Sequence, residues 1–360
     1  MVHTATITYV PASKELFNAF INANGTAYYQ QENKYMNTSY KEQGIRVSAY
    51  IMKKNGYSTY AFKCRINFKR LIEQQDRIAI YSDADFDKMV NKFNTIMGYL
   101  GGLPSFGNWN TNRIDYCINI KTPYVKEYIA LMQKGDVPHS QRLSYNPSNR
   151  NYAHQEGSIY LVSKARDKRK SKTGSVTINF YDKENQIRKE QADNGVIEQA
   201  KNILRLEVQC NRPKLDYLKR KYNLDDKKIT SLLSEQISFD ILESAVLSIC
   251  KVGDYYRRTQ ALKKIDELKC HQKTKDNMKL IIDTVSKQYN SIDKARKQLV
   301  KSNKLTKEQF NGYIQKLNNI GINPVTIRDN KHLQDKSLQE GLDSIYDLLV
   351  DAFNENTKNS

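Results

Sequence analysis

The sequence has 360 residues, a formal net charge of +19 and 39% hydrophobic residues. A chain of this length can bury a substantial core and favours two domains over one. No apolar run reaches the roughly 18 residues of a membrane span, and the N-terminus lacks the layout of a signal peptide, so neither a membrane partner nor export is expected.

The five cysteines are odd in number and include no CxxC pair. Neither a zinc site nor a disulfide framework is therefore indicated, and we expect a cytoplasmic protein. Residues 1–220 contain 34 Lys and Arg against 20 Asp and Glu, while residues 221–360 contain 24 against 19. The excess in the first part favours a polyanion such as nucleic acid as partner. A general compositional bias toward lysine is the alternative.

The first predicted elements lie between residues 45 and 135. Two alternating segments joined by Asn55 and Gly56 predict a hairpin over 45–70. An apolar stripe predicts a helix over 82–102. Alternation predicts a strand over 112–120, just after Trp109, which is expected either in the core or stacked on an unpaired base. A helix over 122–135 is predicted to begin with Thr122 as N-cap.

Three further strands are predicted at 157–162, 175–181 and 203–209, and a polar helical insert at 183–201 separates the last two. From about residue 222 onward all segments have helical periodicity, and no internal repeat is apparent. The prediction is an α+β domain at 1–222 followed by an all-α domain at 223–360. Within 291–327, two helices and an extended piece allow a helix-turn-helix or winged helix, an ordinary helical bundle, or a dimerisation module.

Three of the strands are predicted to share one polar face, because residues two apart in a strand point the same way. If they lie in one sheet, that face carries Asp115, Tyr181 and Glu207. Two carboxylates suit a hard divalent cation such as Mg²⁺ or Mn²⁺. Lys183 would help a tyrosine hydroxyl to become a nucleophile. The alternative is an ordinary sheet with one wet face.

The segments "RIDYCINI", "GSIYLVSK", "INFYDKE" and "LRLEVQ", in this order, resemble the rolling-circle replication initiators of small plasmids and filamentous-type phages. The resemblance covers roughly residues 110–212. It implies an antiparallel-sheet nuclease domain of the Rep and relaxase type. It also implies that Tyr181 attacks origin DNA, and that Asp115 and Glu207 bind the metal.

The implied activity is metal-dependent, site-specific nicking and rejoining of one DNA strand, through a 5′-phosphotyrosine intermediate. The implied partners are origin DNA, single-stranded or in a hairpin at the nick, and the host helicase and polymerase. A homodimer also remains open. The alternatives are a relaxase or transposase with the same chemistry, and a non-catalytic nucleic-acid-binding protein.

The sequence departs from the family's pattern at two points. Many plasmid members carry an aspartate where this chain has Asn119. The larger superfamily also uses a His-hydrophobe-His pair, and none of the five histidines here forms one. A carboxylate-based metal site is therefore the better expectation. The residues predicted to bind DNA are the two polar-face arginines and the cations of the loop before the Tyr181 strand: Arg113, Arg205, Lys164, Arg166, Lys168, Arg169, Lys170 and Lys172.

Overall fold

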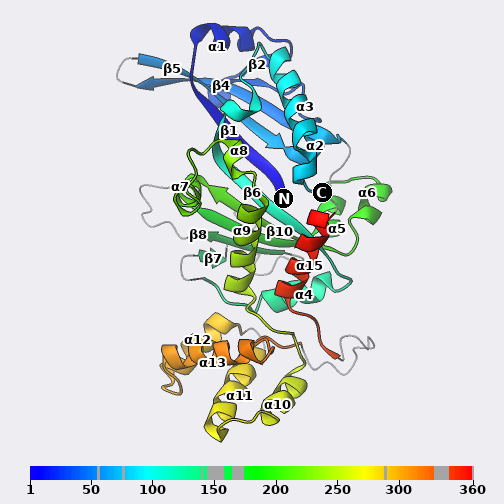
Figure 1. Cartoon of the computed structure of the whole chain (residues 1–360), viewed down its shortest axis with the longest axis vertical. Coiled ribbons are helices and arrows are strands. Elements are labelled where there is room, and N and C mark those ends of the chain that lie inside the picture. The colour runs from blue at the N-terminus through cyan, green and yellow to red at the C-terminus, as the bar shows by residue number, and fades with distance from the viewer. Residues whose placement is uncertain are drawn as a thin grey trace.

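The computed structural model describes residues 1–54, 57–74, 78–138, 141–143, 158–163, 174–287, 290–327 and 340–358. The described chain is α+β, as predicted, and is built on a large antiparallel sheet (Figure 1). The predicted basic loop and the predicted turn at Asn55 and Gly56 lie outside the described residues. In the described part, no helix has both the length and the apolar character needed to span a bilayer.

The sheet contains ten strands, and neighbouring strands run antiparallel. They are β1 (Val2–Ala12), β2 (Thr26–Tyr29), β3 (Lys34–Asn37), β4 (Ile45–Lys54), β5 (Tyr57–Asn67), β6 (Asn110–Lys121), β7 (Gln141–Leu143), β8 (Ser158–Ser163), β9 (Val176–Asp182) and β10 (Ile203–Asn211). Their order across the sheet is β2-β3-β4-β5-β1-β6-β10-β9-β8-β7. The predicted hairpin is β4 with β5, and the four strands predicted after residue 110 are β6, β8, β9 and β10.

Helices follow the strands and dominate the last third of the chain. They are α1 (Lys14–Ile21), α2 (Phe68–Ile72), α3 (Phe86–Tyr99), α4 (Val125–Met132), α5 (Lys183–Lys189), α6 (Asn194–Gln199), α7 (Arg212–Lys221), α8 (Ile229–Leu232), α9 (Glu235–Ile249), α10 (Arg258–Asp266), α11 (Gln272–Ser286), α12 (Ile292–Lys301), α13 (Lys307–Asn319) and α15 (Ile345–Lys358). Short 3-10 turns are η1 (Gln30–Glu32), η2 (Asp83–Asp85) and η3 (Phe106–Asn108).

One face of the sheet forms the core. Its alternate residues, such as Ile118 in β6 and Leu206 in β10, are fully buried. Helix α1 covers this face over β4 and β5, and α9 and α15 cover it over β6 (Figure 1). Because side chains alternate along a strand, the residues between them point to the opposite face. The opposite face is free of these three helices, but at Ile203 of β10 it is covered by a second buried cluster that includes Ile78 and Ile187 of α5.

The two halves of the sheet repeat the same topology. The first half is β1, α1, then β2 to β5, then α2; the second is β6, α4, then β7 to β10, then α7, with α5 and α6 inserted before β10. In each half the first strand lies innermost and pairs with the last one, and β1 and β6 meet at the centre. The sequence alone shows no such repeat, since the strands share an arrangement and not an obvious residue pattern.

One local prediction is wrong, and one open alternative is decided. Helix α4 begins at Val125, two residues after the predicted first helical residue Pro123, and Thr122 accepts a hydrogen bond from the backbone of Tyr124 instead of capping the helix. Trp109 is fully buried and donates to the carbonyl of Pro104 at 2.9 Å, so it belongs to the core and does not stack on a base.

The helices after residue 222 form two groups, one packed on itself and one packed on the sheet. Helices α10 to α13 contact one another and lie at one end of the molecule, whereas α9 and α15 pack on the sheet (Figure 1). Helices on both sides of α10–α13 in the chain therefore belong to the layer that covers the sheet. The predicted boundary near residue 222 thus places two sheet-covering helices in the second domain.

Candidate active site on the polar sheet face

The strand register brings the predicted site strands side by side. β10 lies between β6 and β9, with Gln209 opposite Asp115 and Arg205 opposite Tyr181. Residues directly opposite each other in a ladder share a face. Asp115, Tyr181 and Glu207 therefore lie on one face of three adjacent strands, as the alternation predicted.

Tyr181 and Glu207 contact each other directly. The Tyr181 hydroxyl donates a hydrogen bond of 2.6 Å to Oε1 of Glu207. The tyrosine is buried, with 7% of its surface exposed. A phenol held by a carboxylate in this way has a fixed orientation, which a nucleophile needs.

His3 completes the cluster and was not predicted as a site residue. Its Nδ1 lies 3.0 Å from Oε1 of Glu207. Val2 pairs with Tyr116 but Thr4 pairs with Asp115, so β1 has one extra residue at this point, and that residue is His3. Such a bulge re-aims a side chain. Simple alternation therefore places the imidazole on the wrong face, and nothing in the sequence around His3 signals the bulge.

Asp115 is a residue of β6 and pairs with the neighbouring strand β1. Its Oδ2 accepts hydrogen bonds from Arg113, at 2.8 Å, and from Thr4, while its buried Oδ1 has no hydrogen-bond partner among the described residues. Burial raises the pKa of this carboxyl, although Arg113 and Thr4 act in the opposite direction. One carboxylate oxygen thus remains available to a ligand.

The charges in the cluster favour a carboxylate beside a neutral phenol. Burial alone would raise the pKa of Glu207, but the hydrogen bond from His3 and the nearby Arg205 outweigh it and lower this pKa to about 2. Burial and the adjacent Glu207 raise the pKa of Tyr181 well above its usual value. Tyr181 is therefore protonated in this arrangement, and its attack on a phosphate requires a group that removes the proton.

Lys183 is the first residue of α5 and is 2% exposed. Its Nζ donates to Oε1 of Gln186 at 2.9 Å. Burial, followed by the nearby Arg205, lowers the pKa of Lys183 to about 7. A lysine with this pKa is neutral in a large fraction of molecules near neutral pH, so it can accept a proton.

Arg205 is fully buried. Its guanidinium donates to Oδ1 of Asn119 at 2.7 Å and to the carbonyl of Ile78, and it lies 4.0 Å from Glu207. Its contacts are with protein, and this geometry does not present it to DNA as the sequence suggested. Asn119 holds Arg205 here and is not beside Asp115. Arg113 is partly exposed, with 25% of its side chain accessible, whereas the Arg205 side chain is fully buried.

The two carboxylates of the cluster fit a divalent cation that is held jointly by the protein and by a phosphate of the substrate. The described residues include no group of three His, Cys, Asp or Glu side chains close enough to enclose a metal ion. Mg²⁺ is commonly held by only one or two carboxylates together with substrate phosphates. Asp115, with its unpartnered buried oxygen, and Glu207 match that mode of binding.

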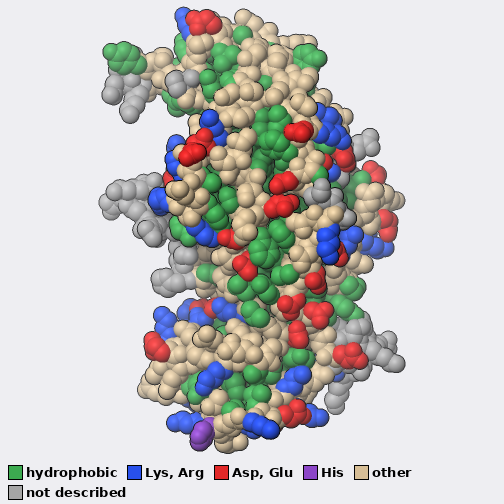
Figure 2. Space-filling view, in the orientation of Figure 1, with side chains coloured by type: hydrophobic (Ala, Val, Ile, Leu, Met, Phe, Trp, Pro, Cys, Tyr) green, Lys and Arg blue, Asp and Glu red, His purple; other side chains and the backbone are tan. Residues whose placement is uncertain are grey.

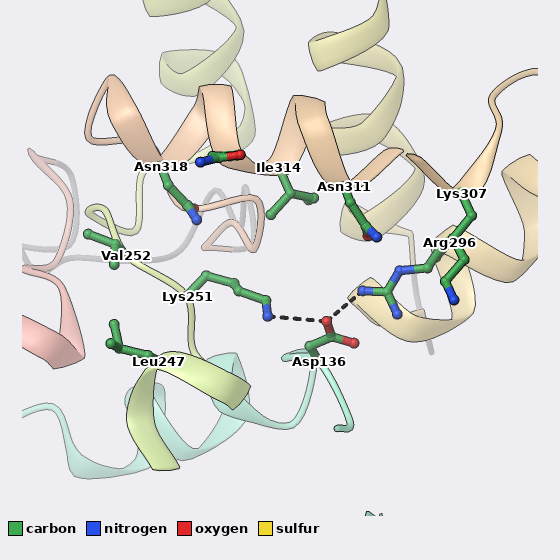
Figure 3. A pocket seen from close by; sticks show the side chains of 10 residues that line it. Asp136, Leu247, Lys251, Val252, Arg296, Lys307, Asn311, Ile314 and Asn318 are labelled. Carbon is green, nitrogen blue, oxygen red and sulfur yellow. Dashed lines mark hydrogen bonds and ion pairs between the residues drawn. The ribbon is translucent and has the colours of Figure 1, made fainter. Parts of the chain in front are cut away.

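A separate pocket of about 500 Å³ lies between the C-terminal part of α9 and helices α12 and α13 (Figure 3). At its centre Asp136 contacts Lys251 at 3.2 Å and Arg296 at 2.5 Å. The carboxylate balances only one of the two cations, so this trio from three chain segments keeps a net charge of +1. This pocket shares no residue with the Tyr181 cluster, and its ion pairs join α12 to the loop after α4.

The comparisons with known proteins are negative. Neither family models nor curated proteins nor solved structures gave a match to this chain.

Proposed function

We propose that the chain is a rolling-circle DNA replication initiator that nicks and rejoins one strand of origin DNA. The observation that carries the proposal is the hydrogen bond between Tyr181 and Glu207, whose carboxylate also contacts His3 and interacts electrostatically with Asp115 and Lys183. Other tyrosines also donate to carboxylates, such as Tyr346 to Glu243, but the acceptor of Tyr181 is in addition contacted by the imidazole of His3. The net charge of +19 supports a nucleic-acid substrate.

In the proposed step, the Tyr181 oxygen attacks the phosphorus of the scissile phosphodiester. A bond forms between this oxygen and phosphorus, and the bond from phosphorus to the 3′ oxygen breaks. The 5′ phosphate then remains on Tyr181, and the 3′ oxygen takes a proton and leaves as a hydroxyl. Glu207 orients the phenol, and Lys183, as a neutral amine, receives its proton. Rejoining is the reverse reaction.

Asp115 and Glu207 would hold the divalent cation, Mg²⁺ or Mn²⁺. When bound, this ion supplies charge neutralisation and polarisation of a phosphate oxygen. His3 keeps Glu207 ionised and correctly directed, as partners of metal-binding carboxylates generally do.

The test is covalent attachment to DNA. Wild-type protein is incubated with Mg²⁺ or Mn²⁺ and a library of single-stranded oligonucleotides with a randomised central segment, and adducts that survive SDS are separated on a denaturing gel. We expect an adduct with the wild-type protein and none with Tyr181→Phe. Tyr160→Phe is the matched control, because Tyr160 lies on the same face of the adjacent strand β8 and is 40% exposed.

The two variants separate the possible outcomes. If Tyr160→Phe lost the adduct and Tyr181→Phe kept it, the nucleophile would be Tyr160 of β8, and the proposed role of Tyr181 would be wrong. Binding of the library by the wild-type protein without any adduct, with either metal, would favour a non-catalytic nucleic-acid-binding protein.

A further inference from the structure

The repeated topology of the sheet allows its two halves to be matched residue by residue. Asn67 ends β5 and is the N-cap of α2, and Asn211 ends β10 and is the N-cap of α7. Independently, β1 has an extra residue at His3 and β6 has one at Asn112, where Thr6 pairs with Arg113 but Ile7 pairs with Thr111. If Asn67 is matched with Asn211, the strands that pair with β5 and β10 are matched as well, through their ladder registers. This matches His3 of β1 with Asn112 of β6, so both landmarks give the same alignment.

This alignment places Tyr50 of β4 at the position of Tyr181 of β9. Tyr50 lies opposite Ala61 as Tyr181 lies opposite Arg205. One ladder step away, Ser48 lies opposite Lys63 as Asn179 lies opposite Glu207. The first half therefore contains a tyrosine in the corresponding place, on the same polar face of the sheet.

The acidic groups of the second half have no acidic counterparts in the first. Lys63 takes the place of Glu207, and Thr6 takes the place of Asp115. Arg65 takes the place of Gln209, and Arg46 pairs with it across the ladder. The first half thus has no carboxylate at these positions to bind a metal or orient a phenol, but it has three cations.

These cations are available to a ligand. Arg46, Lys63 and Arg65 are exposed, and none forms an ion pair with a carboxylate among the described residues. Arg65 interacts electrostatically with both Arg113 and Asp115, at the edge of the Tyr181 cluster, so the basic surface adjoins the candidate active site. Five strand spacings separate β4 from β9, which corresponds to about 24 Å across the sheet.

We propose that Arg46, Lys63 and Arg65, on the polar face of the first half, bind backbone phosphates of the same single-stranded DNA that Tyr181 attacks, and that this half has no chemistry of its own. The proposal rests on the proposed function. Adjacent exposed cations that form no ion pair among the described residues match a polyanionic backbone, and contacts of this kind position a strand without reading its sequence. A strand that crosses β1 and β6 would reach both sites.

The test compares a short and a long oligo(dT) in binding titrations at several salt concentrations. The triple variant Arg46→Gln, Lys63→Gln and Arg65→Gln should bind the long oligo(dT) more weakly. Its slope of log affinity against log salt should fall by about 2, since each phosphate contact to a single strand contributes about 0.7. Binding of the short oligo(dT), which cannot span both halves, should change little, and adducts with the randomised oligonucleotide library should still form at saturating DNA.

A matched control removes the same charge from the other side. Lys14, Lys88 and Lys126 are exposed residues of α1, α3 and α4, on the helix-covered side, where Figure 2 shows basic and acidic groups interspersed. Their triple Gln variant should keep the wild-type slope. If the first triple variant melts at a lower temperature than wild type, its three single variants replace it, and each should lower the slope by about a third as much.

A wild-type slope and affinity for the long oligo(dT) in a folded first triple variant would overturn this proposal, and Tyr181-dependent adducts would leave the proposed function standing. Conversely, a reduced slope in that variant would support the DNA-binding surface whether or not the wild-type protein formed an adduct. The absence of an adduct would contradict only the proposed function. An equal loss of slope in the control triple would mean that net charge alone determines binding, and would also overturn the proposal.

Discussion

Glu207 is the residue on which the other members of the cluster converge. Tyr181 donates to it, His3 lies at 3.0 Å from the same oxygen, and the buried Arg205 lies at 4.0 Å. The orientation of Tyr181 therefore depends on a carboxylate that is itself held by His3. Loss of Glu207 or of His3 should therefore change the orientation of the tyrosine hydroxyl.

His3→Ala should slow adduct formation by about 10-fold to 100-fold, the usual effect of losing a partner of a metal-binding or catalytic carboxylate. His3→Gln, whose amide can still donate to Glu207, should recover part of the rate. His271→Ala, at an exposed position, is the control. The measurement is the single-turnover rate of adduct formation. Equal rates in His3→Ala and wild type would show that His3 has no role at the site.

Lys183 should make stability depend on pH. Its pKa is lowered to about 7 in the folded protein, because burial disfavours the ammonium. Above pH 7 the unfolded chain therefore binds more protons at this residue than the folded one, and the free energy of unfolding should rise with pH up to the usual lysine pKa. Below pH 7 both states carry the proton, and the cost of burying it is present in full.

Lys183→Met should remove this dependence and raise the free energy of unfolding below pH 7 by on the order of a few kcal/mol. Urea unfolding at several pH values between 6 and about 9 measures the effect. Lys189→Met, at an exposed position of the same helix, should keep the wild-type profile. A flat profile in the wild-type protein would contradict the burial of an ionisable Lys183.

The junction between β9 and α5 positions both proposed catalytic side chains. Tyr181 is the second-last residue of the strand, Asp182 caps the helix by accepting from the backbone of Asn185, and Lys183 begins the helix. Glu184 adds an acid in the first turn, where helix N-termini favour negative charge. A strand that turns directly into a helix here brings Tyr181 and Lys183 into one cluster.

Asp182→Ala should lower the free energy of unfolding by about 1 kcal/mol, because it removes the N-cap. It should also slow adduct formation, since Lys183 follows the cap directly. Asp182→Asn, which can still accept the backbone hydrogen bond, should behave like wild type in urea unfolding. Identical stability of the Ala and wild-type proteins would mean that the cap does not hold this junction.

The elements differ in how far the sequence predicts them. Alternation places Asp115, Tyr181 and Glu207 on one face, because side-chain direction in a strand has a period of two. The bulge that turns His3 toward Glu207 shifts this period by one residue without any local signal. The burial of Arg205 depends on the carbonyl of Ile78, far away in the sequence. Distant contacts of this kind cannot be read from local patterns.

At the scale of the whole molecule, the sheet has one apolar and one polar face, and helices from the end of the chain cover the apolar one. Tyr116 of β6, on the apolar face, donates to the carbonyl of Leu232 in α8 at 3.0 Å, and Tyr128 of α4 donates to the carbonyl of Asp343. The sheet and the C-terminal helices thus share a core. The sequence predicts the change to helices near residue 222, but not that some of them return to the sheet.

A protein truncated after residue 222 should therefore expose the apolar face of β6 and β10 and aggregate. Light scattering and circular dichroism of the purified fragment measure this. The full-length chain under the same conditions is the control. A monomeric, cooperatively folding fragment would show instead that residues 1–222 are an independent domain.

The central claim is that Tyr181, among 24 tyrosines, is the nucleophile. The most direct test digests the purified protein–DNA adduct with nuclease and protease and locates the residual nucleotide by peptide mass spectrometry. We expect the nucleotide on the peptide that contains Tyr181, with a phosphate ester on its hydroxyl. A nucleotide on any other tyrosine, including Tyr50 or Tyr160, would contradict the account.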